Sequence, residues 1–272
     1  IAELSASGGI VMAAGFENRI LNYTRTQTFL IMLTTCMLFA SQLNAGPLHD
    51  AASEGDVALV NKLIEEGADI NEYESPVGAA LHWAAANGHV NVVAALLNHG
   101  ADPNHLPTTV DANTALRLAA EYGRLEVVEL LLDAGADPNI GADKLFDVPL
   151  HKAAAKNHTD VIALLLAHGA KLEPQGGAKK KTPLHEAARW GSVDALDMLV
   201  DAGANIDFID GYGFTPIRVA AHYNKIESVK RLVEFGADFT IVDKTGLTPL
   251  GYSMKVNNKE VIAILKAAGA TE

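Results

Sequence analysis

The apolar and polar positions of this chain follow a pattern that returns at intervals of 33 to 35 residues. Seven times a leucine or isoleucine precedes a glycine by 19 residues, as Leu184 precedes Gly203. The steps between successive leucine-type positions are 33, 35, 34, 34, 33 and 33 residues. These positions are Leu48, Leu81, Leu116, Leu150, Leu184, Ile217 and Leu250. A nearly fixed period of this length indicates a stacked array of structural repeats.

Each repeat predicts two short helices. Thr182 suits a helix N-cap, and Pro183 suits the first helical position, where its missing N–H costs nothing. The first helix should end at Gly191, because every repeat has Gly or Asn there, as a left-handed residue after a helix requires. A strongly apolar second helix follows, as at 126–132, and ends at a Gly-Ala pair. Alanine pairs such as that at 187–188 let neighbouring helices approach closely, so the units are expected to stack.

The motifs of the repeat carry a resemblance to a known family. Residues 182–188 have the sequence Thr-Pro-Leu-His-Glu-Ala-Ala, and 135–139 have Gly-Ala-Asp-Pro-Asn. Both resemble the ankyrin repeat family, which has this period and a Thr-Pro-Leu-His signature. The resemblance covers residues 46–272 and implies an all-α ankyrin-repeat solenoid of helix-turn-helix units joined by β-hairpin-like finger loops. The seven expected repeats are 46–78, 79–113, 114–147, 148–181, 182–214, 215–247 and 248–272.

The sequence departs from the family pattern at three places. Arg117 and Arg218 replace the signature histidine in the third and sixth repeats. In the last repeat, residues 251–254 have the sequence Gly-Tyr-Ser-Met in place of His-x-Ala-Ala. A terminal repeat is expected to be atypical because one of its faces meets water.

Residues 1–45 are expected to form a signal-peptide-like segment. Met12 is a suitable start, and two arginines precede an apolar run of 12 residues, 29–40. Such a run is too short to span a bilayer but has the length of a signal-peptide core. With cleavage after Ala45, we expect an exported protein, periplasmic or secreted. The alternative is an apolar helix that caps the first repeat, in which case the protein is cytoplasmic.

Charge is distributed unevenly along the chain. The formal net charge of −12 argues against nucleic acid as a partner. Residues 46–139 contain 15 acidic and 3 basic residues, whereas 140–272 contain 16 of each. The acidic half could steer a basic partner, or it could be a solvated surface. The one basic cluster, Lys179, Lys180 and Lys181, could dock an acidic segment or keep a finger loop solvated.

No catalytic motif is found in the sequence. There is no phosphate-binding loop, no His-Glu-x-x-His, no Gly-x-Ser-x-Gly and only one cysteine, Cys36. The resemblance assigns structural hydrogen bonds to the signature histidines His49, His82, His151 and His185. No spacing typical of metal ligands recurs among the ten histidines. We therefore expect no catalytic residue, no metal, no cofactor and no enzymatic activity.

The candidate partner-binding residues lie two positions after each alanine pair. Large aromatic residues occupy this position in three repeats, as Tyr122, Trp190 and Tyr223, and Lys156 and Asn87 occupy it in two others. The resemblance places the position on the concave groove side of the solenoid. Tyr and Trp are favoured as binding anchors, whereas the alternative is that these rings pack over the neighbouring repeat.

Three lengthened finger loops flank the same repeats, at 104–113, 140–147 and 173–181. Insertions in repeat arrays map to loops on one face, which is often the binding face. We therefore expect a monomeric protein–protein interaction module whose mature chain binds a protein of unknown identity and no membrane. The alternatives are a secreted effector that acts in a host cell, or the regulatory part of an enzyme system.

Overall fold

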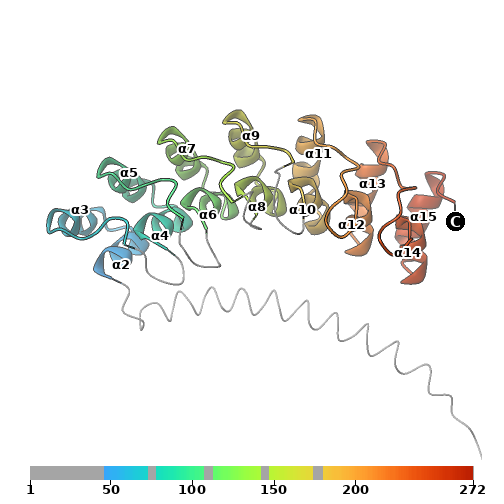
Figure 1. Ribbon diagram of the computed structural model, residues 1–272, viewed down its shortest axis with the longest axis horizontal. Coiled ribbons are helices and arrows are strands. Elements are labelled where there is room, and N and C mark those ends of the chain that lie inside the picture. Colours follow the sequence, from blue (N-terminus) through green and yellow to red (C-terminus); the bar gives the residue numbers. More distant parts are fainter. Residues whose placement is uncertain (1–45, 73–77, 107–112, 142–146, 174–179, 272) are drawn as a thin grey trace, which may run out of the picture. The chain divides into compact units, whose positions relative to one another are not determined.

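A computed structural model of the protein describes residues 46–72, 78–106, 113–141, 147–173 and 180–271 (Figure 1). The repeats belong to one compact unit, residues 47–272. The segment expected to act as a signal peptide, 1–45, lies outside the described residues. The centres of the three lengthened finger loops lie outside them as well.

Within these ranges the repeat unit forms fourteen helices, two in each repeat. The first helices are α2 (Pro47–Glu54), α4 (Ala80–Asn87), α6 (Ala115–Glu121), α8 (Pro149–Lys156), α10 (Pro183–Trp190), α12 (Pro216–His222) and α14 (Pro249–Lys255). The second helices are α3 (Val57–Glu65), α5 (Val90–Asn98), α7 (Leu125–Asp133), α9 (Thr159–Ala167), α11 (Val193–Asp201), α13 (Ile226–Glu234) and α15 (Lys259–Ala267). The predicted all-α solenoid of seven two-helix repeats is confirmed.

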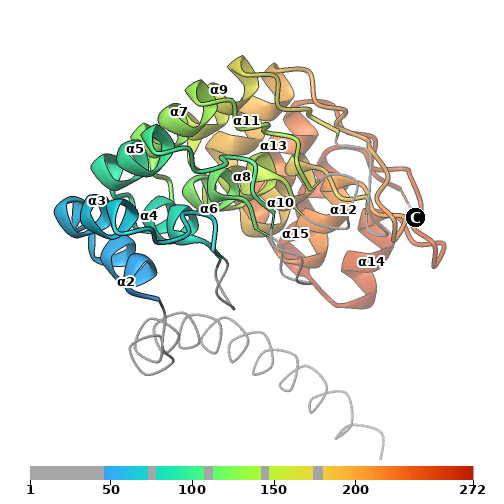
Figure 2. The same ribbon diagram turned by 60° about the vertical axis from the view of Figure 1, so that its left-hand side comes forward.

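The helices lie in two rows. Each first helix contacts the first helices of the neighbouring repeats, and each second helix contacts the neighbouring second helices. The rows can be followed in both views, α2 to α14 in one and α3 to α15 in the other (Figures 1 and 2). Every helix in these ranges has nine or fewer residues, and none is long and apolar enough to cross a membrane.

The ends of the first helices follow the predicted capping. The Thr182 hydroxyl accepts a hydrogen bond from the backbone N–H of His185, with Pro183 at the first helical position. At the other end Gly191 has φ +80°, and Asn157 takes the same left-handed conformation at φ +62° in the repeat before. Because only Gly and Asn tolerate this conformation readily, they mark the helix ends in the sequence.

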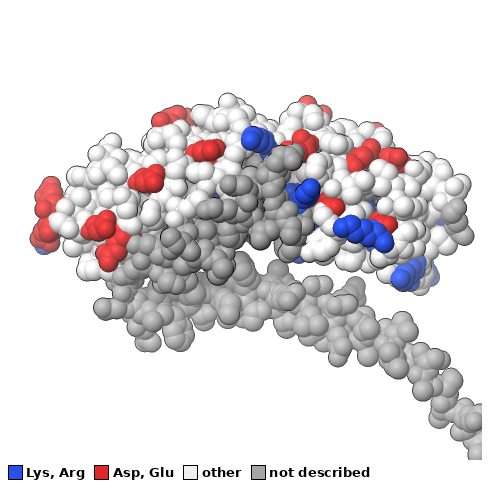
Figure 3. All heavy atoms as spheres, viewed as in Figure 1, with Lys and Arg blue, Asp and Glu red and all other residues white. Residues whose placement is uncertain are grey.

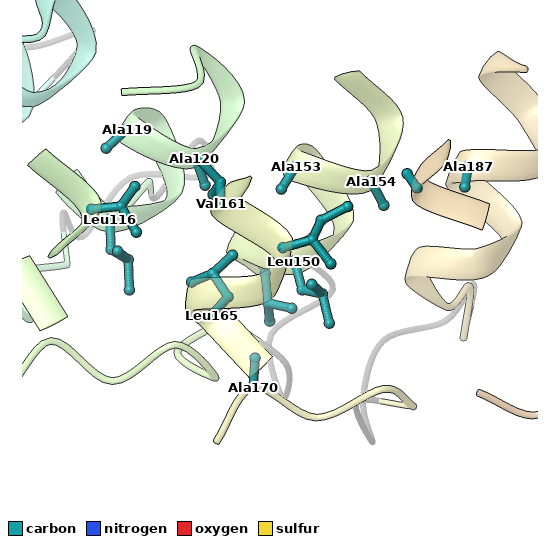
Figure 4. Packing of buried hydrophobic residues seen from close by; sticks show 14 of the residues in the cluster. Leu116, Ala119, Ala120, Leu150, Ala153, Ala154, Val161, Leu165, Ala170 and Ala187 are labelled. Atoms are coloured by element: carbon teal, nitrogen blue, oxygen red, sulfur yellow. The ribbon is translucent and has the colours of Figure 1, made fainter. Parts of the chain in front are cut away.

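One continuous core runs through the array from Leu48 to Leu265. Leu150 and Leu165, from α8 and α9 of one repeat, are fully buried. The alanines of successive first helices, such as Ala120 and Ala153, are also fully buried between the helices of the first row (Figure 4). Their small side chains allow these helices to pack closely, so the core belongs to pairs of repeats rather than to single ones.

Two finger loops are described in full, and both are hairpin-like. The backbone N–H of Asp210 donates to the carbonyl of Phe214 at 2.9 Å, and that of Asp243 donates to the carbonyl of Leu247 at 2.9 Å. Asp210 and Asp243 also accept hydrogen bonds from the backbone N–H groups of their own turns. The expected finger loops are therefore confirmed at residues 210–214 and 243–247.

Candidate functional site

The signature histidines tie each first helix to the next finger loop. The His185 Nε2–H donates to the Phe214 carbonyl at 2.9 Å, and its Nδ1 accepts from the Thr182 N–H at 3.2 Å. His151 bonds the Lys181 carbonyl in the same way at 2.8 Å, and His49 bonds the Glu72 carbonyl at 3.0 Å. The predicted structural role therefore holds for these three histidines.

Burial lowers the pKa of three of the signature histidines, His82, His151 and His185. It lowers the pKa of His151 and His185, against the opposing effect of nearby carboxylates and carbonyls. It lowers the pKa of His82 to about 4, helped by the positive charge that His105 can carry. Neutral imidazoles at pH 7 suit a structural tie. Across the described residues, no group of three or more His, Cys, Asp or Glu is placed to hold a metal ion.

In the sixth repeat an ion pair replaces the histidine tie. Arg218 Nε and Nη2 bind one oxygen of Asp243, in the next finger loop, at 2.9 and 2.8 Å. Both side chains are buried. Burial by itself raises the pKa of Asp243, but hydrogen bonds from Thr245 and Arg218 outweigh it and hold that pKa at about 2. The arginine therefore connects the same two elements that histidine connects elsewhere.

Two of the three predicted aromatic anchors share one surface. Trp190, at the end of α10, is 44% exposed, and Tyr223, just after α12, is 38% exposed. The Arg189 guanidinium lies 5.3 Å from the Trp190 ring centroid and 5.0 Å from that of Tyr223. The indole N–H of Trp190 donates to Glu186 at 3.1 Å, which fixes the ring while much of the residue stays exposed.

The surface continues toward the last repeat. The His222 ring lies 4.8 Å from Tyr223 and 5.2 Å from Tyr252, and the Arg218 guanidinium lies 3.7 Å from the Tyr252 ring centroid. We call this set the aromatic face; its members are Arg189, Trp190, Arg218, His222, Tyr223 and Tyr252. Four of them, Arg189, Arg218, His222 and Tyr252, lie outside the one repeat position from which the candidate residues were predicted. The residue before that position and the residue after the signature histidine lie on the same face.

Tyr122 stands apart from the other two aromatics. It follows α6 and is only partly exposed, and burial raises the pKa of its hydroxyl. Helix α8 separates α6 from α10, which carries Trp190. The structure therefore brings Trp190 and Tyr223 together and leaves Tyr122 outside the aromatic face.

The polar candidates differ in how far they are engaged. Lys156 is exposed, with its Nζ 6.0 Å from the Trp190 ring centroid. Asn87 uses its amide nitrogen to bond the carbonyl and hydroxyl of Ser53 in the preceding repeat, at 3.1 and 3.2 Å. Lys181 binds Glu186 at 3.2 Å, and Lys180 is exposed. Lys179 lies outside the described residues.

Exposed apolar surface and positive charge both gather toward the C-terminal repeats. The large hydrophobic side chains exposed in the described ranges all lie at position 190 or beyond: Trp190, Ile209, Tyr212, Tyr223, Val242, Met254 and Val256. The helices α2, α4 and α6 contain three acidic residues and one Lys or Arg. The helices α8, α10, α12 and α14 contain one acidic residue and five Lys or Arg. In Figure 3, lysines and arginines likewise gather over the later repeats of the face shown.

Comparison with known proteins agrees with the fold. The family described as ankyrin repeats (3 copies) matches residues 48–142, 140–210 and 202–271. The crystal structure of the human ASB11 ankyrin repeat domain is 27% identical, with a TM-score of 0.73, over 84% of this chain and 100% of that chain. The ankyrin repeat domain of Bcl-3, described as a unique member of the IkappaB protein family, is 26% identical, with a TM-score of 0.67, over 82% of this chain and 98% of that chain.

No curated protein matches the sequence. The family match nevertheless extends over nearly all of the repeat unit, and the repeat signature, the capping residues and the two rows of helices agree with it. Ankyrin repeat domains bind protein partners. This chain therefore belongs to the ankyrin repeat family.

Proposed function

We propose that this protein is a non-catalytic, monomeric module that binds a protein partner through the first-helix row and the finger loops, with Trp190 and Tyr223 as the main anchors. The observation that carries the proposal is the pair of exposed aromatic rings on either side of Arg189. Trp, Tyr and Arg are the residue types that most often dominate the energy of protein interfaces.

The geometry of Trp190 favours an anchor over simple inter-repeat packing. Its indole N–H is satisfied by Glu186, so the ring is already held in place before a partner arrives. Ordering a side chain in advance lowers the entropic cost of binding. Tyr122 is more buried and stands outside the aromatic face, so we assign it a smaller share of the binding energy.

The test uses the full chain as bait for affinity capture, followed by mass spectrometry and by affinity measurements with the captured protein. Trp190→Ala and Tyr223→Ala should each weaken binding by on the order of 2 kcal/mol, roughly thirtyfold, and Tyr122→Ala by less. Glu54→Ala is the matched control, because Glu54 is exposed at the same repeat position of the first repeat. Circular dichroism should show unchanged folding. Parental affinity in both Trp190→Ala and Tyr223→Ala would refute the proposal.

We also propose that the protein is exported and that residues 1–45 are removed. The support is the basic stretch, the apolar run at 29–40 and the small residue Ala45 before the first repeat. N-terminal sequencing of protein recovered from its native host should begin near Gly46. An intact segment on protein from a cytosolic fraction would instead favour the cytoplasmic alternative.

A further inference from the structure

We propose that the aromatic face, together with Lys156 and Lys255, binds an acidic segment of a partner protein, whose carboxylates pair with Arg189 and the two lysines while an apolar side chain covers Trp190 and Tyr223. This inference rests on the proposed function, and it adds the chemistry of the partner. An acidic partner is unexpected for a chain with a net charge of −12, because the acidic N-terminal half of this chain suggested a basic partner.

The cations of this face are available for pairing. The Arg189 side chain makes no hydrogen bond within the described residues, and its one ion pair there, with Glu186, is long at 3.7 Å. Lys156 lies beside Trp190, and Lys255 takes the repeat position of Arg189. Both lysines are exposed and take part in none of the ion pairs found in the described part of the chain. A guanidinium that makes only one long ion pair and is held beside two aromatic rings is suited to bind a carboxylate in a bidentate manner.

The anions of the face are already engaged. Glu186, the one acidic residue of α8, α10, α12 and α14, is 6% exposed and bonds both Lys181 and the Trp190 indole. Asp243 is fully buried in its pair with Arg218. A partner that approaches this face therefore meets positive charge that is only partly neutralised.

The pKa of His222 reflects the positive charge of this face. Burial lowers its pKa, and the positive charges of Arg218, Arg189 and Lys181 lower it further. Three cations, one each from the fourth, fifth and sixth repeats, therefore act on one exposed ring of the aromatic face. A cationic surface of this kind attracts carboxylates and disfavours a basic segment.

A protein segment fits these observations better than a nucleic acid does. The first helices on the N-terminal side, α2, α4 and α6, together contain three acidic residues and one arginine, and this net negative charge disfavours a long polyanion. A short peptide with a few carboxylates can remain over the cationic repeats. Its apolar side chains can also cover exposed rings that phosphates alone would leave open to water.

The test relies on the two tryptophans of the chain, Trp83 and Trp190. Trp83 is 8% exposed on α4, outside the aromatic face, whereas Trp190 is 44% exposed. Fluorotryptophan labelling of the full chain gives one ¹⁹F NMR signal from each, and Trp190→Phe assigns them. The probes are three peptides of equal length with the same Phe and Leu residues, in which the remaining positions are all acidic, all basic, or Ser and Gln.

The acidic peptide should shift the Trp190 signal, leave that of Trp83 unchanged and bind about tenfold more tightly than the neutral peptide. Raising the salt concentration should weaken this binding. Arg189→Gln should lower the affinity for the acidic peptide about tenfold, and Arg189→Lys should lower it less. Lys156→Gln should lower the same affinity about threefold. Lys230→Gln, which removes an exposed lysine from α13 in the other row, is the matched control and should bind as the parent does.

Three outcomes would overturn the inference: equal or tighter binding of the basic or neutral peptide, no difference between Arg189→Gln and Lys230→Gln, or no binding of any peptide. A single-stranded oligonucleotide that competes with the acidic peptide at equal concentration would also overturn it, in favour of a general anion site. The proposed function fails separately, when Trp190→Ala and Tyr223→Ala leave the affinity for the captured protein unchanged.

Discussion

The first three repeats and the last four have the same interior and different faces. Leu116 in the third repeat and Leu184 in the fifth are both buried in the same core. On the first-helix row, Glu54 and Asn87 occupy the repeat position that Trp190 and Tyr223 occupy later in the chain. Stacking restricts the buried positions in every repeat, whereas the exposed positions are free to differ. The exposed positions are therefore the ones that can determine which partner this chain binds.

The largest expected effect tests whether the interiors are equivalent. Leu150→Ala should lower the free energy of unfolding by roughly 2–5 kcal/mol, because Leu150 is fully buried in the core that runs through the array. Leu116→Ala should cost a similar amount in the acidic half, where Leu116 is buried to the same extent. Urea unfolding measures both. A cost below about 1 kcal/mol for either variant would mean that its repeat does not share the common core.

The next prediction compares how stability depends on pH at two residues in the signature position, His82 in the second repeat and Arg218 in the sixth. Burial holds the pKa of His82 at about 4 in the folded state, below its ordinary value of 6.5. The unfolded chain therefore binds more protons between these values, and the stability that neutral His82 provides is complete above pH 6.5 and declines as the pH falls toward 4.

The contribution of His82 alone to the free energy of unfolding should be lower by about 2 kcal/mol at pH 5 than at pH 7. The lowered pKa values of His151 and His185 act in the same direction. The pair of Arg218 with Asp243 should persist, because the pKa of Asp243 is about 2. Urea unfolding at pH 7 and pH 5 should show that the free energy of unfolding falls less in His82→Asn than in the parent. Equal losses in the two proteins would contradict the assignment.

The smallest effects concern exposed charges. Lys156→Gln and Glu54→Gln should each change the free energy of unfolding by less than about 0.5 kcal/mol, because both side chains are exposed. Only Lys156→Gln should slow association with the captured partner at low salt, since only Lys156 lies beside Trp190. Stopped-flow association kinetics would show this. Equal slowing by both variants would indicate steering by the whole molecule rather than by one face.

The fold could be predicted from local rules that every repeat obeys. Thr182 and Pro183 start α10, and Gly191 ends it, each through conformations that the residue types themselves prefer. The period of the leucine positions then determined which helices stack. These rules act within one repeat or between immediate neighbours, so a single sequence was enough to apply them.

The candidate site was only partly predictable, because its members meet across repeats. Trp190 and Tyr223 were found at one repeat position, but their link through Arg189 depends on side-chain directions that the period does not specify. Tyr122 occupies the same position and is nevertheless more buried. The pair of Arg218 with Asp243 was missed because Arg218 appeared only as a departure from the signature.

The most direct test of the account is to locate the partner on the molecule. A photo-crosslinking phenylalanine analogue is placed in the full chain at Tyr223 or, as the matched site on the other face, at Asn87, which has the same repeat position. Irradiation in the native host should give a crosslinked protein adduct from position 223 and little or none from position 87. An adduct from position 87 alone, or equal yields from both positions, would contradict the claim that the C-terminal repeats carry the binding face.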